Sequence, residues 1–487
     1  MADLFSERLE GRRTVRVISD DIIEKKLNTI NPHWGRGAVD EEYSRLPRRK
    51  YFQLFYPLAS NFKVRRAVVL MGPRRVGKTV MLFQTIGELI SNGLKATSAA
   101  YMSLDEPLFY SMSLEVLCEK YCKATKEKSL DGKVIIFDEI QYLKNWDVQL
   151  KVLVDRHKHT KFLVSGSAAG ALKRQSHESG AGRFTDFMLP PLTFCEYLEL
   201  LDLAPKLLNQ ERANGKAVSS KNIESLNREF LNYLNYGGFP EAIMNPAIRA
   251  NPAKFIQQDI IDKVLLRDLP SIYGIEDIQE LNRLFKYLTY QTGNEISYEK
   301  LSQSSGVAKN TIKRYMEYLE AAYLIKIVTR VDETGKTFKR ANFFKVYLTN
   351  PSMYAATYGL VDAEDNETLG GLVETAVFSQ WMHDPGWMRN LYYAKLAKNR
   401  GEVDIVFVDE SFKIQWCLEV KWSDAYFDKP GKLVSLKRFC EINSPKNVTV
   451  TTKTKSGEAT IGKSKVSFKE TAIVCFNIGN TLMNDKK

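Results

Sequence analysis

The sequence lacks the features of membrane and secreted proteins. None of its apolar runs approaches the roughly 20 residues that a membrane-spanning helix needs, and the 487-residue chain begins Met-Ala-Asp-Leu-Phe-Ser-Glu-Arg. That start has no charged segment followed by an apolar one, as a secretory signal would have. We therefore expect a cytoplasmic protein without membrane contacts.

Cysteine and histidine are also scarce. The chain has 6 cysteines and 5 histidines. The cysteines form no C-x-x-C pair, and the histidines show no spacing typical of metal ligands. This pattern favours buried free thiols over disulfides or a zinc site, so any metal is expected on oxygen ligands.

The composition, 44% hydrophobic and 26% charged, is that of a globular protein. A chain this long should divide into two to four domains, because single cores stop growing at about 250–300 residues. The excess of 70 Lys and Arg over 58 Asp and Glu gives a formal charge of +12. That charge favours contact with a nucleic-acid backbone, although basic residues also serve solubility alone.

A phosphate-binding loop is the most informative motif. The run from Gly72 to Thr79 reads G-x-x-x-x-G-K-T, between an apolar strand and a helix expected over Val80 to Ile90. The glycines allow backbone N–H groups to surround phosphates, the lysine can reach the β- and γ-phosphates, and the threonine hydroxyl suits Mg²⁺. A chance glycine turn is the alternative, but the flanking strand and helix favour ATP binding. The expected nucleotide contacts are Gly72, Pro73, Arg74, Arg75, Val76, Gly77, Lys78, Thr79 and Val80.

A second apolar strand, Lys133 to Ile140, ends in two adjacent acids. Asp138 is placed to hold the Mg²⁺ shell and Glu139 to orient the attacking water. The alternative is a strand followed by a solvated acidic turn. The next strand ends at Ser165 and Ser167, where either serine could sense the γ-phosphate or cap the following helix.

Arg183 follows in a glycine-rich loop before another strand. A lone arginine there could stabilise the transferring phosphoryl group.

Five motifs occur in one order: the phosphate loop, Phe137-Asp-Glu-Ile140, Ser165-Gly-Ser167, the segment from Gly182 to Tyr197, and Tyr236-Gly-Gly-Phe-Pro-Glu241. Together they resemble the bacterial and archaeal AAA+ ATPases that carry a C-terminal domain of unassigned function with a nuclease-like fold. The resemblance spans about residues 50 to 430. It implies an α/β AAA+ core, a helical lid and, after it, a winged helix.

The residues themselves favour a winged helix. Ser297 can cap a first helix, Gly306 can form a turn, and a second helix can open at Asn310. Its core positions are Ile312, Tyr315, Met316 and Leu319, while Lys309, Lys313 and Arg314 face outward. Residues 324 to 340 read as two strands around a turn, adding Lys336, Lys339 and Arg340. Such a module either binds DNA or joins proteins; we expect DNA.

Four polar residues mark the C-terminal third: Glu374 in a helix, Asp404 in a strand, and Glu419 with Lys421 in the next. Side chains two apart in a strand share a face, so the last pair should point at Asp404. Carboxylates can hold Mg²⁺ and a lysine can activate water. The pattern resembles the PD-(D/E)XK nucleases, which implies Glu374, Asp404 and Glu419 as metal ligands and Asp404, Glu419 and Lys421 as catalytic. An inactive binding scaffold or an unrelated acidic rim remain alternatives.

These expectations define an α/β chain that hydrolyses ATP, engages DNA and carries a nucleotide-gated nuclease-like domain, by analogy in defence against foreign DNA. The alternatives are a nucleotide-switched regulator with an inactive C-terminal domain and a protein-remodelling ATPase without nucleic acid. A homo-oligomer would let Arg183 act on a neighbour. The expected divisions are an N-terminal arm (1–50), the AAA+ core (51–200), the lid (201–275), the winged helix (276–350) and the nuclease-like domain (351–487).

Overall fold

Five parallel strands form the first sheet of the computed structural model, which describes residues 19–166, 182–209, 218–337, 342–397 and 401–484. The strand order is β2-β3-β4-β1-β5, and every neighbouring pair is parallel. The three central strands are buried along their whole length, as their apolar sequences require. The strands are β1 (Ala67–Met71), β2 (Ala99–Ser103), β3 (Val134–Asp138), β4 (Lys161–Gly166) and β5 (Phe184–Met188).

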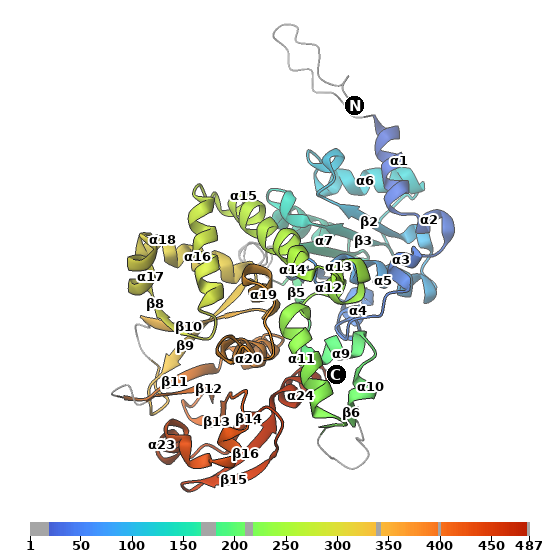
Figure 1. The fold of residues 1–487 in the computed structure, drawn as a ribbon. Helices are drawn as coiled ribbons and strands as arrows, with labels where there is room; N and C mark the ends of the chain where they lie inside the picture. Colours follow the sequence, from blue (N-terminus) through green and yellow to red (C-terminus); the bar gives the residue numbers. More distant parts are fainter. Residues whose placement is uncertain (1–18, 167–181, 210–217, 338–341, 398–400, 485–487) are drawn as a thin grey trace.

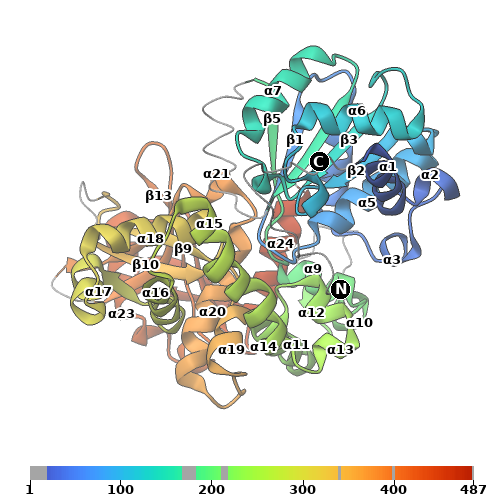
Figure 2. The same cartoon turned by 90° about the horizontal axis from the view of Figure 1, so that it is seen from above.

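Helices cover this sheet (Figures 1 and 2). The N-terminal segment, expected as an arm, forms short helices on the core, and α1 lies beside α6. The bounds are α1 (Asp20–Ile30), α2 (His33–Arg36), α3 (Glu41–Ser44), α4 (Phe52–Ser60), α5 (Lys78–Ser91), α6 (Leu114–Thr125) and α7 (Trp146–Arg156).

A helical segment follows the sheet and reaches the second half of the molecule. Its turn at Gly237 and Gly238 is a close approach: a Cβ on Gly238 would lie 2.4 Å from Cγ of Asn350. The glycines thus permit contact between the two halves. The elements are α9 (Phe194–Leu200), α10 (Ala204–Leu207), β6 (Leu208–Asn209), β7 (Ser219–Ser220), α11 (Ile223–Tyr236), α12 (Pro240–Met244), α13 (Pro246–Arg249), α14 (Pro252–Phe255), π-helical turns at Ile256–Ile261 and Val264–Asp268, and α15 (Leu269–Tyr273).

The next segment contains two helices joined at Gly306, which has φ of 73°. Ser297 caps the first, accepting a hydrogen bond from the Lys300 amide at 3.2 Å. The four core positions expected in the second helix are buried. The elements are α16 (Ile278–Tyr290), β8 (Glu295–Ser297), α17 (Tyr298–Ser305), α18 (Lys309–Ala321), β9 (Ile325–Val331) and β10 (Phe343–Leu348).

The described partner strand of β9 is β10, which pairs with it antiparallel, and Thr337 forms an isolated bridge to Val331. Beyond its first residue β10 is buried, whereas residues 332–336 are mostly polar. Lys339 and Arg340 lie outside the described residues.

Nine strands form the second sheet, in the order β15-β16-β14-β13-β12-β11-β9-β10-β8. Strands β9 and β11 pair in parallel, with Arg330 opposite Tyr393. The sheet therefore runs across the expected division after residue 350. Its remaining strands are β11 (Leu391–Lys395), β12 (Glu402–Val408), β13 (Ile414–Glu419), β14 (Asn447–Thr452), β15 (Gly457–Ile461) and β16 (Ser464–Glu470).

The last helix joins the two halves. It begins at Thr471, lies against α9, and occupies the space between the two halves in Figure 2. This helix is α24 (Thr471–Asn484), and the other helices here are α19 (Ser352–Tyr358), α20 (Asn366–Trp381), α21 (Pro385–Met388), α22 (Ala425–Asp428) and α23 (Val434–Asn443). All six cysteines are free and five are buried. In the part of the chain described, no helix combines the length and apolar character that crossing a bilayer requires.

Candidate functional site

The phosphate loop opens a cleft of about 850 Å³ at the carboxyl end of the first sheet. Ligands of open parallel sheets bind at this end of the strands. The cleft is lined by loop residues, by Glu139 and by the lid. Its lining includes Arg74, Arg75, Gly77, Lys78, Thr79, Val80, Glu139, Pro240, Glu241 and Lys263.

Lys78 is buried and donates to the carbonyl oxygens of Gly72 at 3.0 Å and Pro73 at 2.7 Å. Gly77, at φ of 94°, starts α5 in a conformation that favours glycine. Burial lowers the pKa of Lys78, an effect opposed by the charges of Glu139 and Asp138. A phosphate is a stronger acceptor for this ammonium than two neutral carbonyls.

Asp138, at the end of β3, gathers the polar groups of three strands and the loop. The hydroxyls of Thr79 and Tyr101 donate to its Oδ2, each at 2.7 Å. The Ser165 hydroxyl and the Glu139 amide donate to its other oxygen. Ser165 thus contacts Asp138 from β4, while Ser167 lies outside the described residues. A hydroxyl beside a fixed carboxylate is the donor set that Mg²⁺ takes beside a phosphate.

Glu139 faces the cleft from a strained backbone, with φ of 54°. Burial raises the pKa of its carboxyl, and the positive charge of Lys78 opposes that rise. Gln141 donates to Oε2 of Glu139 and orients it. The carboxylate thus lies at the cleft, where the sequence predicts a residue that orients water.

The two loop arginines bind acids of the lid. Arg74 makes a two-point contact with Asp268, Nε to Oδ2 at 2.6 Å and Nη2 to Oδ1 at 2.7 Å. Arg75, at φ of 63°, contacts Glu241 at 2.9 Å and Asp259 at 3.3 Å. The phosphate loop and the lid are thereby joined by charge.

Arg49 is a buried arginine for which the sequence predicts no role, and it contacts the phosphate loop. Arg49 is 7% exposed and binds both oxygens of Glu196, at 2.9 and 2.8 Å. It also donates to the carbonyls of Val76 at 3.0 Å and Pro190 at 2.8 Å. In the sequence this residue belongs to a run of three basic residues, 48–50. Such runs are usually exposed, so the run did not predict a buried contact.

Arg183 lies away from this cleft. It precedes β5, whose first residue pairs with the first residue of β1, whereas the phosphate loop follows the last residue of β1. Its guanidinium is exposed and contacts Asp155 at 2.9 Å. It is therefore placed at the opposite end of the sheet from its own phosphate loop.

Asp404, Glu419 and Lys421 come together at the second sheet, but β13 ends at Glu419, so Lys421 lies just beyond the strand in which it was expected. Lys421 Nζ lies 2.8 Å from Oε1 of Glu419 and 3.5 Å from Oδ2 of Asp404. The amide of Val420 donates to the same Asp404 oxygen at 2.7 Å. Oε2 of Glu419 is buried without a hydrogen-bond partner. Burial and the charge of Asp404 raise the pKa of Glu419 to about 8.

Glu374 does not join them as a third ligand. Its Oε1 accepts from Lys345 Nζ at 2.8 Å and from the Tyr347 hydroxyl at 2.6 Å. Across the described ranges, no three His, Cys, Asp or Glu side chains come together in a group that could hold a metal ion. The prediction that Glu374 joins Asp404 and Glu419 as a metal ligand is therefore corrected, because Lys345 of β10 binds Glu374.

The remaining pair still suits one Mg²⁺, which proteins commonly hold by one or two carboxylates and several waters. The partnerless Glu419 oxygen next to Asp404 is the observation that fits such an ion. Glu402, two residues before Asp404, contacts Lys345 at 3.0 Å. Sequence reasoning missed Glu402, although the spacing E-x-D in a strand signals a shared face.

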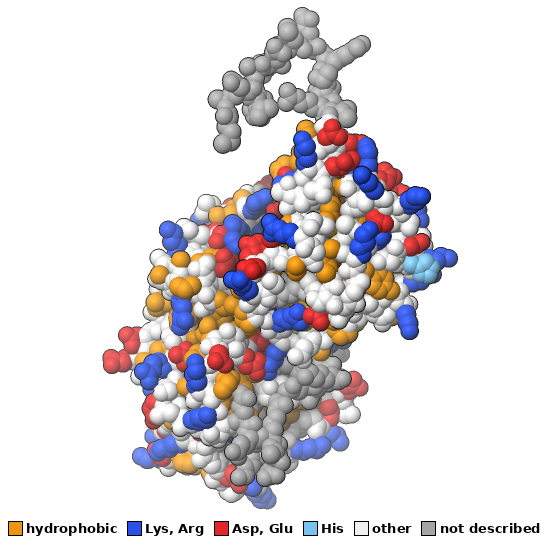
Figure 3. Space-filling view, turned by 90° about the vertical axis from the view of Figure 1, so that its right-hand side faces the viewer, with side chains coloured by type: hydrophobic (Ala, Val, Ile, Leu, Met, Phe, Trp, Pro, Cys, Tyr) orange, Lys and Arg blue, Asp and Glu red, His pale blue; other side chains and the backbone are white. Residues whose placement is uncertain are grey.

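On α18, Asn310, Lys313 and Arg314 are exposed, as expected, whereas Lys309 is bound to Glu299. Over the face shown in Figure 3, basic and acidic side chains alternate across both halves. The net charge therefore does not gather into one patch on that face.

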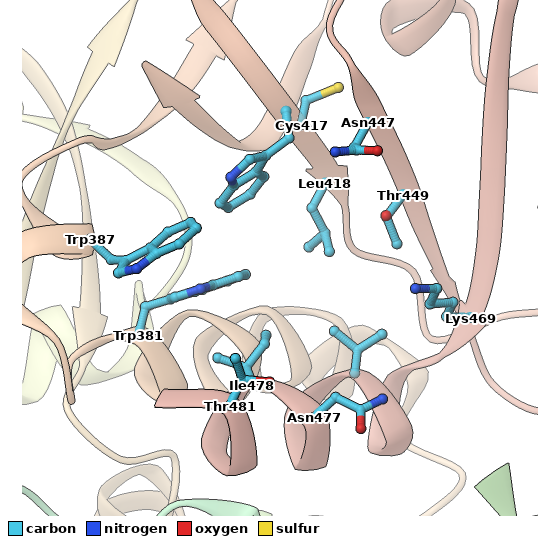
Figure 4. A pocket seen from close by; sticks show the side chains of 12 residues that line it. Trp381, Trp387, Cys417, Leu418, Asn447, Thr449, Lys469, Asn477, Ile478 and Thr481 are labelled. Atoms are coloured by element: carbon cyan, nitrogen blue, oxygen red, sulfur yellow. The ribbon is translucent and has the colours of Figure 1, made fainter. Parts of the chain in front are cut away.

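An aromatic cavity of about 300 Å³ opens between the second sheet and α24. In Figure 4, Trp381 and Trp387 line one side and Asn447, Thr449 and Lys469 the other. The ring of Trp416 stacks on that of Trp381, with centroids 5.5 Å apart. Among the described residues that line the cavity, Lys469 alone is charged.

Known proteins resemble the chain over both halves. Residues 64–198 match a family described as an AAA domain, and residues 227–364 match a domain of unknown function, DUF8612. An uncharacterized protein of Methanocaldococcus jannaschii is 26% identical over 72% of this chain and 74% of its own length. An uncharacterized protein of Haemophilus influenzae is 23% identical, over 70% and 76%.

A solved structure titled C. elegans PCH-2 covers 47% of this chain and 65% of its own at 13% identity, with a TM-score of 0.28. The family match, the parallel sheet and the cleft agree with one another. Residues 64–198 are thus an AAA-type domain, which indicates nucleotide-dependent ATPase activity.

Proposed function

We propose that the protein is an AAA+ ATPase that binds ATP with Mg²⁺ and hydrolyses it in the cytoplasm. The convergence of Lys78, Thr79, Asp138 and Glu139 on one cleft carries the proposal. Thr79 and Asp138 would hold the ion, which would neutralise charge on the phosphates. Lys78 would exchange its two carbonyls for phosphate oxygens, and Glu139 would orient the water.

Nucleotide binding should change the contacts between the phosphate loop and the lid. A phosphate would compete with Asp268 for the guanidinium of Arg74 and with Glu241 for that of Arg75. Asp268 directly precedes α15, and α15 precedes α16 and the helix pair α17–α18. The nucleotide state would thus alter the position of the second half.

The first experiment measures ATP binding by calorimetry. Lys78→Ala should abolish binding, because it removes the ammonium that reaches the phosphates. Lys95→Ala, an exposed lysine paired with Glu127, is the control and should bind as the wild type does. Unchanged binding by Lys78→Ala would contradict the proposal.

We also propose a homo-oligomer, which the position of Arg183 supports. At the amino end of β5 it could reach only the cleft of a neighbouring subunit. There it would stabilise the charge of the transferring phosphoryl group, after leaving Asp155.

DNA is the proposed partner of the second half. The segment from α16 to β10 has the order of a winged helix, with α18 as the helix that would enter a groove. Lys313 and Arg314 are exposed there, and the tryptophan cavity offers a stacking surface for an unpaired base. A protein-remodelling ATPase would instead show DNA binding that is absent or insensitive to salt.

The C-terminal domain is proposed to be nuclease-like. Its elements α20, β11, β12, β13, α23 and β14 follow the order helix, three strands, helix, strand. Asp404 and Glu419 would hold one Mg²⁺, which would polarise a phosphodiester, and Lys421 would orient the attacking water. Cleavage gated by nucleotide would suit defence against foreign DNA.

A regulator with an inactive domain is the second candidate. The capture of Glu374 by Lys345 and Tyr347 favours it, since one expected metal ligand is engaged. Incubating DNA with the protein and Mg²⁺, with and without ATP, separates the two. Asp404→Ala and Lys421→Ala should lose cleavage but retain ATP hydrolysis; cleavage by neither wild type nor variants would favour the regulator.

A further inference from the structure

Lys345 is a buried cation at the centre of the carboxylate cluster. It comes from β10, which precedes the helix and strands that carry the acids. The side chain is 1% exposed, so water hardly solvates its charge. Its Nζ lies 2.8 Å from Glu374, 3.0 Å from Glu402 and 4.0 Å from Asp404. Burying an ammonium is costly unless acids surround it in this way.

Asp404 stands between two cations. Its Oδ1 faces Lys345 at 4.0 Å, and its Oδ2 faces Lys421 at 3.5 Å. In two-metal centres a shared carboxylate commonly bridges ions about 3.5–4 Å apart. Here the ammonium of Lys345 occupies the side of Asp404 on which Glu374 and Glu402 lie.

Three ammonium groups contact the carboxylates of the centre. They come from Lys345, Lys421 and Lys395, and Lys395 is shared with Glu295 at 3.6 Å. The four carboxylates are Glu374, Glu402, Asp404 and Glu419. Oε1 of Glu419 contacts Lys421, whereas its Oε2 is buried without a hydrogen-bond partner, which leaves this oxygen for one added cation.

We propose that the ammonium of Lys345 is a built-in cation that takes the place of a second divalent ion. The centre then accepts at most one divalent ion, at Asp404 and Glu419, and Glu374 is a partner of Lys345 rather than a metal ligand. The same lysine ties β10, and with it the helix pair, to the strands of the nuclease-like domain. The inference rests on the proposed carboxylate centre but not on its cleaving DNA.

The test counts Mn²⁺ bound by the full-length protein, by electron paramagnetic resonance titration without nucleotide or DNA. Lys345→Ala should bind one more Mn²⁺ per chain than the wild type, because it frees three carboxylates and the space between them. Lys345→Arg keeps the charge and should bind no more than the wild type. Lys345→Ala combined with Glu374→Gln should lose the added ion.

A second measurement, of the melting temperature Tm, keeps the test decisive if Lys345→Ala folds weakly. Lys345→Ala should have a lower Tm, since its acids lose their counter-charge, and Mn²⁺ should raise that Tm by several degrees more than it raises the wild-type Tm. Equal Mn²⁺ counts in wild type and Lys345→Ala, together with equal Mn²⁺ effects on Tm, would overturn the inference. A wild type that binds two ions in this centre would also overturn it. Absence of cleavage would leave these counts unchanged and bear only on the proposed function.

Discussion

Removal of the Arg49 guanidinium should loosen the phosphate loop. The side chain makes two charged hydrogen bonds to Glu196 and one each to the carbonyls of Val76 and Pro190, all with little access to water. Arg49→Met would leave the Glu196 carboxylate buried without its counter-charge. Removing one partner of a buried pair costs about 3–5 kcal/mol, so the local free energy of opening should fall by that amount. The loop carbonyl of Val76 loses its donor as well, and ATP affinity should weaken.

Hydrogen exchange of the β1 and α5 amides measures this opening locally, which avoids assuming two-state unfolding of a long chain. Arg49→Met with Glu196→Met should recover much of the loss, because two apolar side chains leave no buried charge. Arg45→Met is the matched control, since Arg45 pairs with Glu41 on an exposed helix. Equal protection in Arg49→Met and Arg45→Met would refute the reasoning.

The remaining predictions concern assembly, pH and DNA. Arg183→Ala should reduce ATP turnover about 10³-fold or more, and mixing it with Lys78→Ala subunits should restore activity; mixtures no more active than their parts would exclude action on a neighbour. Burial lowers the pKa of Lys161 to about 8 from 10.5. Between these two pH values the unfolded chain keeps a proton on Lys161 that the folded chain has released. The free energy of unfolding should therefore rise with pH by up to about 3 kcal/mol. Denaturant titrations at pH 8 and 10.5 should show this rise in the wild type and not in Lys161→Met. Lys313→Ala with Arg314→Ala should lower DNA affinity and reduce the slope of log K against log salt by about 0.9 per lost phosphate contact, and an unchanged slope would remove α18 from the interface.

Local patterns predict which residues of the candidate nucleotide cleft come together. The loop from Gly72 to Thr79 follows β1, and Asp138 and Glu139 stand at the end of β3; parallel strands bring such carboxyl ends to one edge of the sheet. The same reasoning placed Asp404 near Glu419, because they lie on neighbouring strands of one sheet. In both cases sequence spacing and strand geometry determine which side chains meet.

Contacts between distant segments were not predictable in this way. Arg49 reaches Glu196, and Lys345 reaches Glu374, from elements whose relative placement depends on the whole fold. From the sequence alone, a charged residue in an apolar strand such as β10 predicts a position at the exposed edge of a sheet. The partners of its side chain must be known before the position can be recognised as buried. The parallel pairing of β9 with β11 likewise needs a crossover that sequence patterns do not specify.

ATP turnover by Glu139→Gln shows whether this cleft hydrolyses ATP with Glu139 orienting the water. The variant keeps Lys78, Thr79 and Asp138, so it should bind ATP and Mg²⁺ with the wild-type affinity. Its turnover should fall by about 10²–10⁴-fold, the usual contribution of a positioned base. Wild-type turnover in Glu139→Gln would contradict the assignment of this cleft as a hydrolytic centre.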